Sequence, residues 1–254
     1  MDLKQTLLSE KEVGHKGGIY NKFQVDMSYN SNHIEGSRLS HEQTRYIYET
    51  NTIGVGIAGS EEAVNVNDVI ETVNHFRCFD HILETLGDAL TEQYIKHLHM
   101  LLKSGVTDKN AVIGEFKTAA NEVGGMETVE PQKVAGLLKD LVSEYDSKPM
   151  TLYDIAAFHT AFEHIHPFYD GNGRVGRLII LKQCLENDIV PVIINDRDKM
   201  FYYMGLKEWQ TNNKSERLIN VFLASQDDTE QALKYFGIDY DRPQRTYSDV
   251  ISQK

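Results

Sequence analysis

The segment from His166 to Arg177 brings together, within 12 residues, side chains that could hold a polyphosphate while a proton is removed. The imidazole of His166 changes charge near neutral pH, so it could accept the proton of a hydroxyl group that attacks a phosphate. Asp170 offers carboxylate oxygens, which are the ligands that Mg²⁺ or Mn²⁺ prefers in proteins. The segment therefore predicts phosphate chemistry, with His166 as the general base and Asp170 as the metal ligand.

A glycine-rich turn, Gly171-Asn172-Gly173, comes directly before the helix that we expect to start near Arg174. The glycines let the backbone turn tightly and bring its N–H groups close to an anion. The start of the helix would add its positive end to the same place. Because Arg174 and Arg177 are three residues apart, both guanidinium groups could reach the same polyphosphate, such as the tail of ATP.

Two helices must position this segment. Apolar residues three and four apart line one face of a helix that begins near Leu152, with Thr151 as its N-cap. The next helix contains Leu178, Leu181 and Leu185 and is apolar nearly all round, so we expect it to be central and buried. The segment between them is therefore predicted to be a helix–loop–helix turn.

The same apolar spacing recurs through most of the chain and predicts an all-α fold. Ser40 and Gln43 form a capping-box pair before a helix over His41–Thr50. Further helices are predicted over residues 66–86, 94–105, from Pro131 to 141, over 200–210 and over 216–236. Two glycine-containing segments do not fit a helix: Thr52–Ser60, predicted to be a connection, and Val112–Thr128, predicted to be a small β-hairpin.

The composition is that of an ordinary globular protein, since 41% of the residues are hydrophobic and 25% are charged. A net charge of −12 argues against binding nucleic acid or anionic membranes, because both require a basic face. No apolar run approaches the roughly 20 residues of a membrane span, and the N-terminal residues do not resemble a signal peptide. We expect a cytoplasmic protein in which Cys78 and Cys184 are reduced and buried.

The order His-Pro-Phe-x-Asp-Gly-Asn-Gly-Arg-x-x-Arg resembles the signature of the Fic family, and every fixed position is present at residues 166–177. The resemblance implies a Fic fold and a protein adenylyltransferase. In such an enzyme His166 would deprotonate a Ser, Thr or Tyr hydroxyl of a target protein, or of the chain itself. That oxygen would attack the α-phosphate of ATP and retain AMP. Gly173 stands where the kinase-like Doc toxin has lysine, which implies adenylyl rather than phosphoryl transfer.

The resemblance also assigns roles at the phosphates. Asp170 would hold Mg²⁺ (or Mn²⁺), and Asn172 with the loop amides would bind the α-phosphate. Arg174 would bind the β-phosphate and Arg177 the γ-phosphate.

A second pattern, Ser31-x-x-x-Glu35-Gly36, resembles the inhibitory motif of Fic proteins that carry an inhibitory helix before the catalytic core. By that resemblance the carboxylate of Glu35 pairs with Arg177 and keeps the γ-phosphate from docking, while Ser31 orients the carboxylate. The competing interpretation is an ordinary helix end with Ser31 in solvent. Many relatives have asparagine after the glycine. Here Ser37 follows, which leaves the strength of inhibition open.

The resemblance divides the chain into three parts: residues 1–60 with the inhibitory helix, 61–212 as the Fic catalytic core, and 213–254 as a C-terminal helical extension. The hairpin at 112–128 corresponds to the flap on which the target docks by backbone pairing. Tyr202 and Tyr203 are candidates for contact with adenine, and the alternative is that they belong to the core.

Three alternative functions stay open at this point. The protein could remove AMP, with Glu35 orienting a water, or transfer a different phosphate-containing group. It could also be a non-catalytic module that senses ATP. His159 and His164 invite a zinc site, but five residues apart on a helix they do not share a face, so we expect no metal there. The target protein and a homo-oligomeric state are left open by the sequence.

Overall fold

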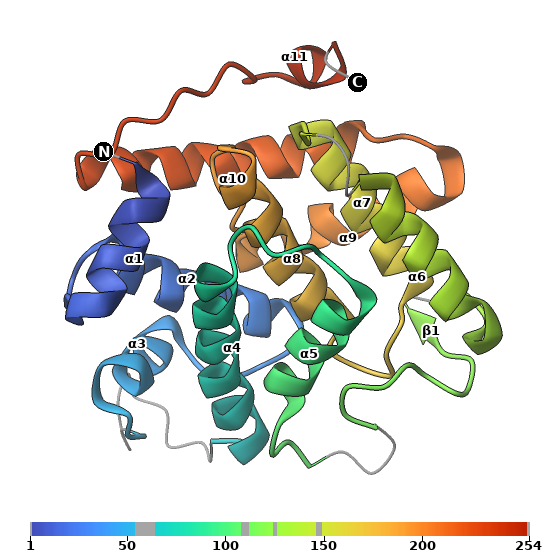
Figure 1. Cartoon of the computed structure of the whole chain (residues 1–254), viewed down its shortest axis with the longest axis horizontal. Helices are drawn as coiled ribbons and strands as arrows, with labels where there is room; N and C mark the ends of the chain where they lie inside the picture. Colours follow the sequence, from blue (N-terminus) through green and yellow to red (C-terminus); the bar gives the residue numbers. More distant parts are fainter. Residues whose placement is uncertain (1, 54–63, 108–111, 124–125, 146–148, 253–254) are drawn as a thin grey trace.

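The computed structural model describes residues 2–53, 64–107, 112–123, 126–145 and 149–252. Helices make up nearly all of its regular structure, which confirms the all-α prediction (Figure 1). The helices are α1 (Leu3–Val13), α2 (Ile19–Ile34), α3 (His41–Thr50), α4 (Val66–Glu84), α5 (Glu92–Lys103), α6 (Pro131–Tyr145), α7 (Leu152–Ile165), α8 (Asn172–Glu186), α9 (Lys199–Asn212), α10 (Glu216–Tyr235) and α11 (Tyr247–Ile251), with a short 3₁₀ helix, η2 (Asp196–Asp198). None of the helices in these ranges is long and apolar enough to span a membrane.

The helix starts follow the capping signals in the sequence. In α3 the hydroxyl of Ser40 accepts the N–H of Gln43, and the Gln43 side chain accepts the N–H of Ser40. Thr151 caps α7 in the same way, together with Asp154. Capping pairs of this kind satisfy N–H groups that have no partner inside the helix, so they fix where each helix begins.

The predicted hairpin is much smaller than the segment assigned to it. Within the described part of 112–128, pairing is confined to β1 (Glu122–Val123) and β2 (Met126–Glu127), which run antiparallel. A flap of the predicted length is therefore not confirmed. Most of the predicted connection over Thr52–Ser60 lies outside the described residues.

Helix α8 lies at the centre of the molecule and contacts α2, α4, α5 and α7 (Figure 1). Leu178, Leu181 and Leu185 share one face of the helix, and Ile179 and Ile180 lie on the other faces. All five are buried, which confirms the prediction of a central helix. The same helix carries Arg174 and Arg177, so the central position that buries its leucines also buries two guanidinium groups.

One hydrophobic cluster includes side chains from all three parts suggested by the sequence, from Leu3 in α1 to Val250 in α11. The division near residues 60 and 212 therefore remains a prediction about roles and does not correspond to separate cores. Helices α1 and α11 were not predicted. Cys78 and Cys184 are both buried free cysteines.

Close contact between α9 and α10 depends on Gly205. A Cβ atom there would lie 2.8 Å from the backbone nitrogen of Leu218, whereas a Cβ atom at Gly136 in α6 would meet nothing within 4 Å. We predict that Gly205→Ala lowers the free energy of unfolding by about 1–3 kcal/mol, because the backbone of α10 must shift. The matched variant Gly136→Ala should raise it by up to about 1 kcal/mol, since alanine favours the helix. Urea unfolding of both variants tests this packing, and an unchanged midpoint for Gly205→Ala would contradict it.

Candidate active site

The candidate site is built on the loop between α7 and α8. His166 ends α7 as its C-cap residue in the left-handed region, at φ 49° and ψ 63°, and its N–H donates to the carbonyl of Phe162. This conformation is uncommon for a residue with a side chain. Gly171, at φ 83°, is the N-cap residue that precedes α8. These two turns reverse the chain so that the imidazole and the N-terminal end of α8 belong to the same short loop.

Contacts from outside the loop hold it in place. The side chain of Phe168 is fully buried and stacks on His99 of α5, with ring centroids 3.8 Å apart. The Nδ1 atom of His99 accepts the N–H of Gly114, so its Nε2–H donates to the carbonyl of Asp170. Burial lowers the pKa of His99 to about 4, which keeps the ring neutral, as this pattern requires. His99 therefore joins α5, the loop and the segment before the strands.

Asn172 also closes the loop. Its side-chain oxygen accepts the N–H of Phe168 at 2.8 Å, and its NH₂ group donates to the carbonyl of Phe168 at 2.9 Å. The amide is thus committed to the backbone of its own loop. The prediction that Asn172 helps to bind the α-phosphate therefore rests on its backbone N–H and on the shape of the turn.

The imidazole of His166 is neutral and almost buried. Burial, followed by the nearby Lys117 ammonium group, lowers the pKa of His166 to about 4. In the described part of the chain its Nδ1 atom has no hydrogen-bond partner, and the carboxyl group of Glu163 lies 3.9 Å away. A neutral ring has a free nitrogen lone pair, so it can accept a proton at physiological pH.

Glu163 was not predicted as a site residue. It lies three residues before His166, so both side chains emerge on one face at the end of α7. Burial raises the pKa of Glu163 to about 8, despite the opposing charge of Arg177. Its Oε1 atom lacks a hydrogen-bond partner among the described residues. His166 and Glu163 therefore form a buried pair of uncharged titratable groups, and the helical spacing of the two was the sequence signal for it.

Lys117 connects the strand region to the same loop. Its N–H donates to the carbonyl of Pro167, and its buried ammonium group donates to Asn121, to Thr128 and to the carbonyl of Ile165. Burial lowers the pKa of Lys117 to about 8. The position of β1 and β2 beside His166 is therefore set by this lysine.

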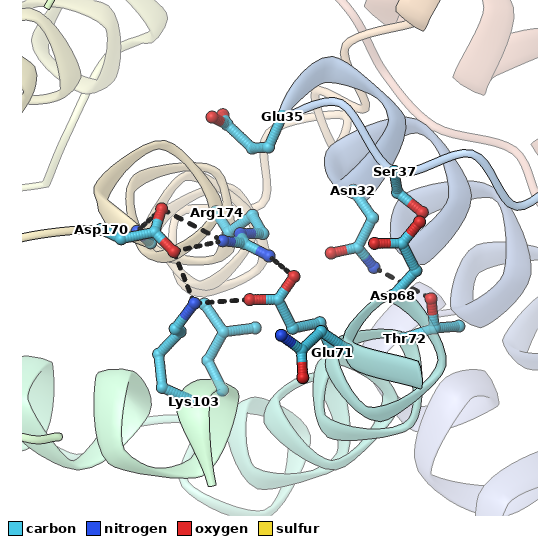
Figure 2. Close-up of polar contacts among 12 residues, drawn as sticks. Asn32, Glu35, Ser37, Asp68, Glu71, Thr72, Lys103, Asp170 and Arg174 are labelled. Atoms are coloured by element: carbon cyan, nitrogen blue, oxygen red, sulfur yellow. Dashed lines mark hydrogen bonds and ion pairs between the residues drawn. The ribbon is translucent and has the colours of Figure 1, made fainter. Parts of the chain in front are cut away.

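The start of α8 carries a network of alternating charges (Figure 2). The guanidinium group of Arg174 pairs with Glu71 of α4 and with Asp170, and the ammonium group of Lys103 lies 2.6 Å from Glu71 and 2.5 Å from Asp170. Burial alone would raise the pKa of Asp170, but Arg174 and Lys103 hold it at about 2. Glu71 and Lys103 were missed by sequence reasoning because they lie about 70 to 100 residues before the motif and carry no local pattern.

Arg177 binds Ser31 and Glu35, the two residues of the predicted inhibitory motif. Its Nη2 atom donates to Glu35 at 2.7 Å, and its Nε atom donates to the hydroxyl of Ser31 at 3.0 Å. Ser31 is 2% exposed, so the alternative in which it is solvated is wrong. A Cβ atom at Gly173 would lie 2.3 Å from Glu35 Oε1, so the carboxylate rests directly on the first turn of α8.

The two candidate tyrosines have different positions. Tyr202 is fully buried, and its hydroxyl bonds to His159 Nε2 at 2.7 Å, so its predicted contact with a nucleotide is corrected to a place in the core. Tyr203 is 37% exposed and lines a pocket of about 820 Å³ beside Thr128 and Glu163. Of the two rings, only that of Tyr203 is accessible to a ligand.

The acidic side chains at the start of α8 suit a metal ion that arrives together with phosphate. Within the described residues, no three His, Cys, Asp or Glu side chains cluster closely enough to hold a metal ion by themselves. Mg²⁺ commonly needs one or two carboxylates and takes its remaining oxygens from water and phosphate. Asp170 offers such a carboxylate, with a side chain 47% exposed, and the ammonium group of Lys103 already places a positive charge on it. Asp170 therefore fits the role predicted for it.

Comparison with known proteins agrees with this geometry. Residues 89–184 match the family model described as Fic/DOC family. The chain is 31% identical over 224 residues to the protein adenylyltransferase Fic of Drosophila willistoni, covering 85% of this chain and 42% of that protein. It is 30% identical over 179 residues to the protein adenylyltransferase Fic of Aedes aegypti, covering 69% of this chain and 35% of that protein. The chain thus spans less than half the length of these relatives.

The fold is also found among solved structures. A Fic domain containing signaling protein from Bacteroides thetaiotaomicron aligns with a TM-score of 0.72 at 22% identity, covering 95% of this chain and 99% of that one. A fragment of Fic-1 from Caenorhabditis elegans aligns with a TM-score of 0.72 at 20% identity, covering 92% and 73%. At these identities the likeness establishes the helical fold alone.

The burial of His166 makes a direct prediction about its titration. We expect its imidazole to stay neutral as the pH falls and to take up a proton only near pH 4, because the folded protein disfavours the charged ring. NMR titration of the ring resonances measures this, with the signal of His166 assigned by its loss in His166→Gln among the 10 histidines. A midpoint near the ordinary value of 6.5 would contradict the buried position.

Proposed function

Residues 89–184 of this chain belong to the Fic/DOC family, and we propose that the chain is a protein adenylyltransferase. It transfers AMP from ATP to a Ser, Thr or Tyr hydroxyl of a target protein or of the chain itself. The observation that carries the proposal is the loop between α7 and α8. That loop sets a buried, neutral imidazole beside the start of a helix that carries two arginines.

The chemistry assigned to His166 is proton removal. Its imidazole accepts the proton of the target hydroxyl while the hydroxyl oxygen forms a bond to the α-phosphorus of ATP. The bond between the α-phosphorus and the oxygen bridging to the β-phosphate breaks, pyrophosphate leaves, and AMP stays on the target. Transfer of this kind rests mainly on positioning and charge stabilisation, so the loop geometry matters more than the basicity of the ring.

Backbone and guanidinium groups at the start of α8 would hold the phosphates. No side chain among the described residues caps the first turn of α8, so its N–H groups face the anion directly. Gly173 leaves room for a close approach, and Arg174 and Arg177 supply positive charge for the β- and γ-phosphates. A divalent cation held by Asp170 would supply additional positive charge to the phosphates when bound.

The pocket beside Tyr203 is the place we assign to the base of the nucleotide. It adjoins Glu163 at the end of α7 and Thr128 next to β2, so it opens beside the loop that carries His166. An accessible aromatic ring together with Met204 and Leu206 suits a flat, partly apolar base. The target chain would lie along β1 and β2, because a two-stranded sheet has outer edges to which an extended chain can add a strand.

We assign an inhibitory role to Glu35. Its carboxylate occupies Arg177 and rests on Gly173, which is where the proposal places a phosphate. Two anions cannot use the same guanidinium group and helix start, so ATP must displace Glu35 or bind in a shifted position. The Ser31 contacts with Arg177 hold the guanidinium group in the orientation that favours Glu35.

The reaction class can be tested with labelled ATP. We expect label from the α-phosphate to be retained on protein and label from the γ-phosphate to be lost, because pyrophosphate is the leaving group. Intact-mass analysis should show the addition of one adenylyl unit, and His166→Ala should lower the rate by at least about 100-fold through loss of the base.

The other outcomes separate the alternatives. Retention of γ-label alone would mean that the protein is a kinase, and retention of neither label would leave AMP removal or simple nucleotide binding. Transfer that persists unchanged in His166→Ala would remove His166 from the mechanism.

Loss of the Glu35 carboxylate tests inhibition. If the ion pair with Arg177 disfavours productive ATP binding by ~2 kcal/mol, Glu35→Gly should raise the rate of modification roughly 30-fold. Glu35 is the C-cap of α2, so glycine there does not interrupt the helix. Ser31→Ala keeps the carboxylate and should give a smaller increase. Equal rates for the wild type and Glu35→Gly would exclude this residue from control of the reaction.

A further inference from the structure

Lys103 has no role in the function proposed so far, although its position is unusual. It is the last residue of α5, and its side chain is only 3% exposed. A buried ammonium group is unfavourable unless it is compensated by opposite charge. Two carboxylates compensate it: Glu71 at 2.6 Å and Asp170 at 2.5 Å (Figure 2).

Lys103 already contacts one carboxylate oxygen of Asp170, the residue that the proposed function makes the metal ligand. Its Nζ atom contacts Oδ2 of Asp170, while Oδ1 accepts the N–H of Gly171 and both oxygens face Arg174. Every cation that reaches this carboxylate therefore competes with charges that the protein itself supplies. Arg174 also serves the phosphates in the proposed function. In the part of the chain that the structure describes, the ammonium group of Lys103 donates only to the two carboxylates.

Glu71 provides a second place for the ammonium group. Its Oε1 atom already accepts from Lys103, and its other oxygen pairs with Arg174. Lysine binds as a compact charge on a flexible stem, without the fixed fork of arginine. The group can therefore leave Asp170 by a small rotation and stay paired with Glu71, so its displacement leaves no unpaired buried charge.

We propose that Lys103 is a built-in cation that occupies Asp170 in the absence of nucleotide, and that a divalent cation arriving with nucleotide takes its place. Glu71 then retains the displaced ammonium group. The inference rests on the proposed function, in which Asp170 is the metal ligand. It makes Lys103 a determinant of metal affinity: the free protein binds the metal weakly, and binding strengthens when phosphate oxygens complete the coordination.

The test measures metal binding without catalysis. Mn²⁺ is titrated by calorimetry into the full chain saturated with an ATP analogue in which a methylene group replaces the oxygen between the α- and β-phosphates, so the bond that the reaction breaks is absent. Removal of the competing charge in Lys103→Met should tighten the dissociation constant about tenfold, since a nearby like charge disfavours a cation. Lys103→Arg keeps the charge and should stay much closer to the wild type. Lys96→Met removes a lysine about 10 Å away along the same helix and should have little effect.

A second variant distinguishes whether Lys103 competes with the metal for Asp170 or only supports the shape of the site. Glu71→Gln removes the alternative partner of Lys103, so it should weaken Mn²⁺ binding, opposite in sign to Lys103→Met. If Lys103 merely supported the shape of the site, both variants would weaken binding, and that result would overturn the inference. An unchanged affinity in Lys103→Met would overturn it as well. Thermal unfolding of each variant confirms that the protein measured is folded.

The proposed function fails in a different way. If the wild type binds no Mn²⁺, or if Asp170→Asn leaves Mn²⁺ binding intact, Asp170 does not hold a metal. The metal then has no place in the proposed function, and the inference fails as well. If such binding is present but insensitive to Lys103, only the inference fails.

Discussion

Two guanidinium groups are buried at the start of the central helix, and the arrangement of the site depends on how their charges are compensated. Arg174 and Arg177 are each 3% exposed. Charges at such depth require opposite charge and hydrogen bonds at close range. The chain supplies Glu71 and Asp170 to the first arginine, and Glu35 with Ser31 to the second. The carboxylates that stabilise the folded chain therefore lie where the proposed function places the phosphates of a nucleotide.

This compensation links distant helices to the start of α8. Glu35 follows α2, Glu71 belongs to α4 and Lys103 ends α5, and all three helices pack on α8. A ligand that takes over one arginine must release the carboxylate bound to it. Nucleotide binding as proposed would consequently be an exchange of anions, and its strength would depend on residues that do not touch the ligand.

The loop between α7 and α8 is the second constraint. His166 adopts a left-handed backbone conformation, which contacts from elsewhere must maintain. Stacking of His99 on Phe168 and the two hydrogen bonds of Asn172 to Phe168 provide these contacts. Together they fix the direction in which the imidazole leaves α7. The precision of the candidate base thus comes from groups that have no part in proton transfer.

Local sequence determined the helices around the site, because capping pairs and apolar spacing act within a few residues. It also fixed the spacing of His166, Asp170, Arg174 and Arg177, since these lie on one loop and one helical turn. The pairing of Glu35 with Arg177 could be anticipated only through a resemblance, as 142 residues separate the two. Only the tertiary structure placed Glu71 and Lys103 at Asp170, buried Tyr202 and turned Asn172 inward. These outcomes depend on how whole helices pack, and no periodicity within a single segment encodes which side chain of a distant helix will meet it.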